Sequence, residues 1–265
     1  MPTTYTHYSF GREVLPLLPE AMQQRIAANR SIWSFGLHGP DIFFYRNPFV
    51  KNPVSRIGWE MHTQSGEKVL RRFARLDDGS DRSFAYLAGF LCHFALDSTC
   101  HAYIDAQKAH GVSHSLLETE LDRHFLLKDG LDPVTHDPAS HLHPSGEAAR
   151  AIARFYPQAT ECEVEQALKE MVLYLRLLTA KTAPKRKLLD GAFRVLKAQD
   201  SFGGMVMPRK PVPACQPMVR HLLELYRQSI PLAVELITAW PDLRNPQYQL
   251  NFNGVPGKKR EHEPE

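Results

Sequence analysis

Apolar residues recur at helical spacing along almost the whole chain. Positions three or four residues apart are repeatedly apolar, which predicts amphipathic α-helices, and convincing strand-like alternation of apolar and polar residues is missing. The predicted helices cover residues 10–18, 20–29, 65–76, 82–106, 113–127, 147–155, 160–178, 187–198 and 216–240, with shorter ones within 31–45 and from 53 onward. The pattern therefore predicts an all-α fold, a single multi-helix domain.

Polar and helix-breaking residues predict the ends of these helices. Ser80 and Ser113 precede apolar runs and are good N-caps. Residues 129–145 and 201–217 are rich in Gly and Pro and are expected to be loops, the second a candidate lid. The histidines of the first loop, His136, His141 and His143, are expected on the surface. We expect one domain over residues 1–244 and a polar, flexible tail over 245–265.

Composition and charge exclude several classes of protein. The chain has 265 residues, is 43% hydrophobic and carries a net charge of +3, which is too small an excess to indicate nucleic-acid duplex binding. The longest apolar stretch, near residues 85–96, is too short to span a bilayer. The first residues do not resemble a secretory signal, and the four cysteines form no Cys-x-x-Cys pair. We therefore expect a cytoplasmic protein with reduced thiols and no transmembrane segment.

Histidine is the unusual component of the sequence. Of 13 histidines, 11 lie between His7 and His143. Neutral imidazole is the commonest protein ligand of metals and a frequent general base. The distribution indicates a site in the N-terminal half, although chance clustering on the surface could also produce it.

The strongest candidate site lies in the helix predicted over 82–106. His93, Asp97 and His101 are four residues apart, so their side chains share one stripe of the helix. Their neighbours are apolar, which predicts that the helix is buried. Burying two imidazoles and a carboxylate without a strong partner is costly, whereas both groups are zinc ligands. The stripe therefore favours a metal site over a row of satisfied core side chains.

A second His/carboxylate pair follows on the next predicted helix. His114 and Glu118 share a face, and Asp122 extends that face by one turn as a candidate hydrogen-bond partner of a ligand. Two consecutive helices with such faces can converge on one dinuclear site. Upstream, the candidates with suitable chemistry are His7, His38, Asp41 and His62.

The order of these residues resembles the zinc-dependent phospholipase C family. The pattern is Thr-His near the N-terminus, Asp41 in a Pro-Asp turn, a lone His62, then His-x-x-x-Asp, a further His and His-x-x-x-Glu. The family includes clostridial alpha-toxin and bacterial phosphatidylcholine-preferring phospholipases, and the single-strand-specific zinc nucleases share its fold. The resemblance covers roughly residues 1–125 by motif and implies the same all-α fold.

The resemblance also implies a set of zinc ligands. One zinc would be bound by His101, His114 and Glu118, and a second by Asp41, His62 and His93. Asp97 would bridge to a third, which His7 would also bind. The family's N-terminal tryptophan ligand has no counterpart in the first residues here, so two or three zinc ions are expected.

Such a site predicts a hydrolase of phosphodiesters, because closely spaced zinc ions activate water and stabilise phosphoryl charge. Asp41 is the candidate general base, and His38, Phe44 and Tyr45 are candidate substrate contacts. The substrate is expected to be a phospholipid-like or nucleotide-type phosphodiester. The alternative is a non-catalytic helical protein with a structural zinc site. A di-iron oxidoreductase ranks lower, because its Glu-x-x-His motifs are missing.

Overall fold

The structure, a computed structural model, describes residues 4–50, 52–195 and 203–257 and is all-α there, as predicted. The only β pairing in these ranges is an isolated bridge between Leu250 and Pro256. The α-helices are α1 (Thr4–Val14), α2 (Glu20–Ala27), α3 (Arg30–Gly36), α4 (Pro53–Thr63), α5 (Gly66–Leu76), α6 (Asp81–Ala106), α7 (His114–Lys128), α8 (Gly146–Ala153), α9 (Glu161–Leu178), α10 (Ala183–Val195) and α12 (Gln216–Ala239). The 3-10 helices are η1 (Leu15–Leu17), η2 (Gly39–Tyr45), η3 (Gln107–His110), η4 (Gly203–Met205), η5 (Pro213–Cys215) and η6 (Pro246–Gln249).

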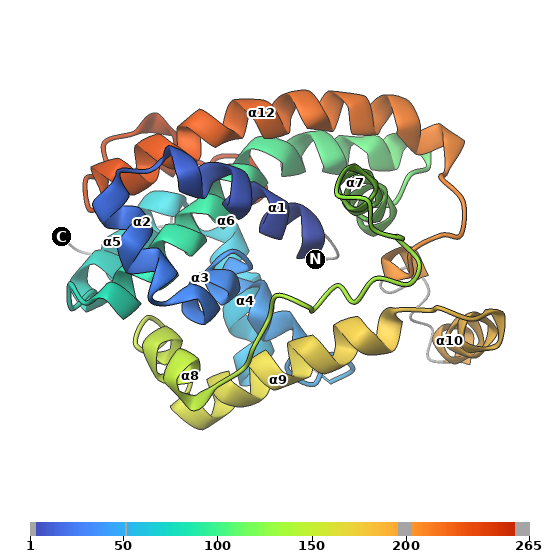
Figure 1. Cartoon of the computed structure of the whole chain (residues 1–265), viewed down its shortest axis with the longest axis horizontal. Helices are drawn as coiled ribbons and strands as arrows, with labels where there is room; N and C mark the ends of the chain where they lie inside the picture. The colour runs from blue at the N-terminus through green and yellow to red at the C-terminus, as the bar shows by residue number, and fades with distance from the viewer. Residues whose placement is uncertain (1–3, 51, 196–202, 258–265) are drawn as a thin grey trace.

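Helix α6 is the central element of the fold. It packs against α3 and α12, and also against α1 and α2 (Figure 1). Gly36 and Gly89 allow the backbones of α3 and α6 to touch, because a Cβ on Gly89 would lie 2.6 Å from the carbonyl oxygen of Trp33. The Ser80 and Ser113 side chains cap α6 and α7 as predicted.

The first helix begins earlier than predicted. It covers Thr4–Val14 rather than residues 10–18, and it ends in a 3-10 turn at Pro16, whose missing N–H stops an α-helix. The early start depends on a distant side chain: Asp122 of α7 accepts hydrogen bonds from the backbone N–H groups of Tyr5 and Thr6. The consequence is that His7 belongs to a helix.

The described part of the C-terminal segment packs onto the core rather than forming the expected polar tail. Tyr248 and Phe252 are fully buried. The Phe252 ring lies 5.2 Å from the His62 ring and 5.8 Å from the His93 ring, between centroids. These two aromatic side chains anchor the polar segment beside the histidine cluster, together with hydrogen bonds such as the one from the Gly66 N–H to the Leu250 carbonyl. Residues 258–265 of the expected tail, and 196–198 of a predicted helix, lie outside the described residues.

No helix in the described ranges is long and apolar enough to cross a membrane.

Candidate metal centre

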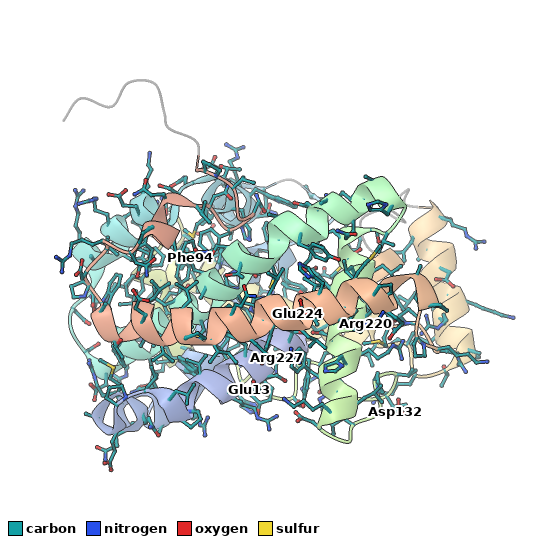
Figure 2. All side chains as sticks on the ribbon, turned by 90° about the horizontal axis from the view of Figure 1, so that it is seen from above. Glu13, Phe94, Asp132, Arg220, Glu224 and Arg227 are labelled. Carbon is teal, nitrogen blue, oxygen red and sulfur yellow. The ribbon has the colours of Figure 1, made fainter. Side chains whose placement is uncertain are left out.

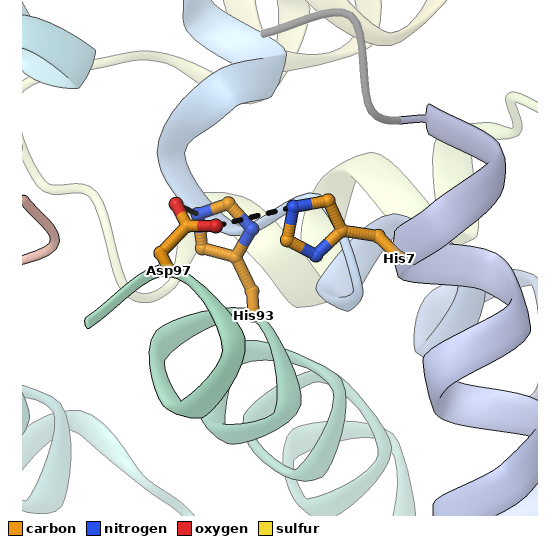
Figure 3. Close-up of side chains that lie close together, drawn as sticks. All are labelled: His7, His93 and Asp97. Atoms are coloured by element: carbon orange, nitrogen blue, oxygen red, sulfur yellow. Dashed lines mark ion pairs between the residues drawn. The ribbon is translucent and has the colours of Figure 1, made fainter. Parts of the chain in front are cut away.

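The carboxylate of Asp97 lies at the centre of the cluster. One oxygen is 3.2 Å from His7 Nε2 and 3.5 Å from His101 Nε2, and the other is 3.1 Å from His93 Nε2. Asp97 and its two histidine neighbours on α6 share one face of the helix, as their four-residue spacing predicts. Figure 3 shows how His7, from α1, reaches across to the same carboxylate.

Asp122 holds the helix that carries His7. Its two carboxylate oxygens accept hydrogen bonds from the backbone N–H groups of Tyr5 and Thr6 and from the Thr6 hydroxyl. Burial raises the pKa of Asp122 to about 7, although these hydrogen bonds act to lower it. The sequence suggested Asp122 as a partner of a ligand; the structure connects it to His7 through the N-terminus of α1.

A second group joins three elements of the fold. Asp41 of η2 lies 3.1 Å from Nε2 of His62, which comes from α4. The Nδ1–H of His62 donates to the backbone carbonyl of Gly58 at 2.8 Å, which leaves Nε2 as the metal-facing nitrogen. His93 completes the group, and the ring of His93 packs against Gly39, whose φ is +47°.

The third group lies between α6 and α7. Nε2 of His101 and of His114 are 3.3 Å and 3.1 Å from the same Glu118 oxygen. On its other side, the His114 ring places Nδ1 2.9 Å from Asp105. A carboxylate in that position orients a ligating histidine and increases its basicity.

These groups have the geometry of metal ligands. Three sets offer ligand atoms within 4.8 Å of one another: His7, His93 and Asp97; Asp41, His62 and His93; and His101, His114 and Glu118. The N···O distances of 3.1–3.5 Å match the edge of a tetrahedron around zinc, about 3.3 Å for ligands near 2.05 Å. Imidazole and carboxylate are also the donors that zinc prefers.

Buried polar atoms without hydrogen-bond partners also favour a metal site. His93 is fully buried, and its two ring nitrogens make no hydrogen bond to the described residues. Nε2 of His93 is 3.1 Å from Asp97, yet the orientation is not that of a hydrogen bond. Leaving an imidazole buried in this state costs about 1–3 kcal/mol per group, which a bound cation would offset. The residues therefore fit zinc.

The protonation states of His93 and Asp97 suit metal binding. Burial lowers the pKa of His93 in spite of the Asp97 charge, so its imidazole is neutral at neutral pH. Burial alone would raise the pKa of Asp97, but the His101 charge and the hydrogen bond from His7 outweigh it and hold that pKa well below its usual range. Neutral imidazole and ionised carboxylate are the forms that bind metal.

The cluster opens into a cavity of about 590 Å³. Asp41, His62, His101, His114 and Glu118 are all on its wall. The other lining residues are Phe44, Trp59, Thr63, Asp105, Lys108, Ser113, Ser115, Met205 and Asn253. The cavity is large enough for a small organic phosphate, and five candidate ligands face it.

The three predicted substrate contacts lie in different places. Phe44 lines this cavity, whereas Tyr45 lines a neighbouring one. Among the described residues that line the two cavities, His38 is absent. Its Nε2 lies 3.0 Å from Nε2 of His141. His141, expected on the surface, is buried, and burial lowers its pKa to about 3. His38 and His141 thus form a neutral, buried pair beside His7.

Sequence reasoning missed Asp105 and Lys108. Asp105 lies four residues after His101, so it continues the stripe of His93, Asp97 and His101 by one more turn. That signal was present in the spacing. Lys108, whose Nζ is 2.7 Å from Asp105, gave no such signal.

Comparison with known proteins agrees with this chemistry. The family model described as zinc dependent phospholipase C matches residues 6–172, which is more than half of the chain and includes all eight candidate ligands. No curated protein and no solved structure matches significantly.

Proposed function

Because the chain belongs to the zinc-dependent phospholipase C family, we propose that it is a zinc-dependent hydrolase of phosphodiesters. The observation that carries the proposal is the continuous cluster of eight His, Asp and Glu side chains, five of which face one cavity. A purely structural zinc site is closed by its ligands, whereas a catalytic site keeps a side open to substrate.

We propose that three sets of residues hold the metal. His101, His114 and Glu118 would hold one zinc, and Asp41, His62 and His93 a second. His7 and Asp97 would contribute to a third site. Asp97, which lies against His7, His93 and His101, is then the side chain that connects the groups. Bound zinc would supply a water of lowered pKa and positive charge for the phosphoryl oxygens.

Asp41 is the proposed general base. Burial acts to raise its pKa, but the close pairing with His62 lowers it, so Asp41 is ionised and can accept a proton. It lines the cavity where a substrate would bind. Lys108 on the same wall provides a positive charge that attracts an anionic phosphodiester. Phe44 and Trp59 offer an apolar surface for the substrate's organic group.

Metal analysis and one generic assay test the proposal. Protein purified without chelator should contain at least one equivalent of zinc, and it should hydrolyse bis(p-nitrophenyl) phosphate or p-nitrophenylphosphorylcholine. Asp41→Asn should lower kcat by about 10²–10⁴-fold. Asp242→Asn, which changes a partly exposed aspartate paired with Arg244, is the matched control and should leave kcat unchanged.

The same protein distinguishes the non-catalytic alternative. If zinc is bound stoichiometrically and neither ester is cleaved, the cluster is structural. His101→Ala and His114→Ala then lower the melting temperature through lost metal binding. In a hydrolase these variants abolish turnover while the helical fold survives.

A further inference from the structure

A second cavity beside the first carries a concentration of exposed apolar side chains. It has a volume of about 430 Å³ and shares Phe44, Trp59 and Met205 with the first cavity. The side chains on its wall that remain about half exposed are Phe49 (51%), Val50 (57%), Trp59 (59%) and Leu177 (46%). They are four of the ten large apolar side chains exposed in the described residues. A cluster of exposed apolar side chains indicates a surface that binds a partner.

Helix α10 extends this surface. It packs through Leu189 and Phe193 in a small apolar cluster that is separate from the main core. Leu188 and Val195 remain 72% and 83% exposed. They are seven residues apart, so they lie on one side of the helix. Figure 1 shows α10 at the end of α9, on the side of the molecule away from α12.

The segment that carries α10 is also rich in positive charge. Residues 173–195 contain six Lys or Arg and one Asp, an excess of five positive charges, whereas the whole chain has an excess of three. The rest of the protein is therefore slightly acidic. Lys181, Lys187 and Arg194 are exposed within this segment. Apolar and cationic side chains together are the pattern of a helix that lies in the plane of a membrane interface.

We propose that this face binds the surface of an anionic lipid bilayer. We define it as the α10 face: Phe49, Val50, Trp59, Leu177 and the exposed residues of α10. Its apolar side chains would enter the headgroup region while its Lys and Arg side chains contact anionic headgroups. A second copy of the chain is a poorer occupant, because two-fold pairing would bring the exposed Lys187 and Arg194 of both copies together. The proposal does not depend on bound metal or on turnover.

Vesicle binding tests the proposal directly. The full chain, as isolated and without chelator, is mixed with vesicles of phosphatidylcholine alone, or of phosphatidylcholine with phosphatidylglycerol, and binding is scored before lipid is hydrolysed. Trp59 reports insertion, because Trp33 is buried and the Trp240 indole is hydrogen-bonded to Asp77. We expect sedimentation with the anionic vesicles, a blue shift of Trp fluorescence and quenching by brominated lipid. Trp59→Phe should remove the blue shift and the quenching but not the sedimentation.

Two pairs of variants locate the contact. Each Lys or Arg near an anionic surface contributes about fivefold in affinity, so Lys187→Gln with Arg194→Gln should weaken binding about 25-fold. Arg220→Gln with Arg227→Gln on α12 (Figure 2) is the matched control and should not weaken it. Leu188→Ser with Val195→Ser should reduce quenching, and Leu17→Ser with Leu127→Ser should not. The proposal would be overturned if the chain bound neither vesicle or bound both equally. It would also be overturned if the two pairs of charge variants lost the same amount of affinity. A dimer that buries Trp59 without lipid would also overturn it.

Discussion

Zinc binding at the His101, His114 and Glu118 group should depend steeply on pH. Burial acts to lower the pKa of His114, but the Glu118 charge and hydrogen bonds to Asp105 and Glu118 raise it to about 9. In the metal-free protein the imidazole is therefore protonated at pH 7. Zinc needs the neutral form, so it must displace a proton. Affinity should rise with pH up to about 9 and then level off.

The magnitude follows from the size of the shift. For one displaced proton, affinity changes tenfold per pH unit below the pKa, so the two units between pH 7 and pH 9 correspond to about 100-fold, or about 2.7 kcal/mol. The pKa values of His7 and His62 are raised as well, since hydrogen bonds to carboxylates outweigh burial. When zinc binds at all of the groups, His7 and His62 should therefore release protons too. The proton released by His114 must be measured separately.

Competition with a chromophoric chelator measures the affinity, and calorimetry in buffers of different ionisation enthalpy counts the protons. The difference between wild type and His114→Ala gives the proton that belongs to His114. Asp105→Ala should lower the pKa of His114 and flatten the pH dependence between 7 and 9, since one of the two carboxylates that raise this pKa is removed. An affinity that stays constant between pH 7 and pH 9 in the wild type would refute the reasoning.

Three further substitutions test the geometry of the centre and of its scaffold. Asp105→Ala, measured above pH 9 where proton competition is gone, should weaken zinc binding about 10- to 100-fold through lost orientation of His114; unchanged affinity would contradict this role. Gly89→Ala places a Cβ 2.6 Å from the Trp33 carbonyl oxygen, so urea unfolding should show a loss of about 1–3 kcal/mol. Gly39→Ala meets a φ of +47° and the His93 ring at 2.3 Å, so both stability and zinc content should fall; a full zinc content would show that the contact is not needed.

The fold was largely predictable because most of its helices carry local signals. Ser80 and Ser113 cap helices through side-chain contacts only three residues away, so their effect is visible in the sequence. The start of α1 was wrong for the opposite reason. Its first N–H groups are satisfied by Asp122, more than a hundred residues away, and no local pattern encodes that contact. The packed segment around Phe252 was missed similarly, since its burial depends on the ring of Phe94 in α6.

For the candidate site, too, contacts within one helix were predictable from the sequence and contacts between elements were not. Spacing on one helix placed His93, Asp97 and His101 together, and the same spacing would have found Asp105. Residue spacing does not show which separate elements pack against one another. Asp41 and His62 come from η2 and α4, and only tertiary packing brings them to His93. His141 shows the limit clearly: a proline-rich loop suggested the surface, yet the loop folds back and buries the ring against Tyr8.

Exposure separates the candidate ligands into two kinds. His7, His93 and Asp97 are at most 4% exposed, and none of them is among the described residues on the cavity wall. His101, His114 and Glu118 are on that wall, with a quarter of the His114 side chain exposed. A cation among the first three would be sealed from substrate and would act mainly on stability, whereas a cation in the groups on the cavity wall would be accessible to substrate. Partial metal removal should therefore abolish hydrolysis before it lowers the melting temperature, because the accessible zinc exchanges first. If melting temperature and activity fall together at every stage of removal, the division is wrong and the cluster behaves as one unit.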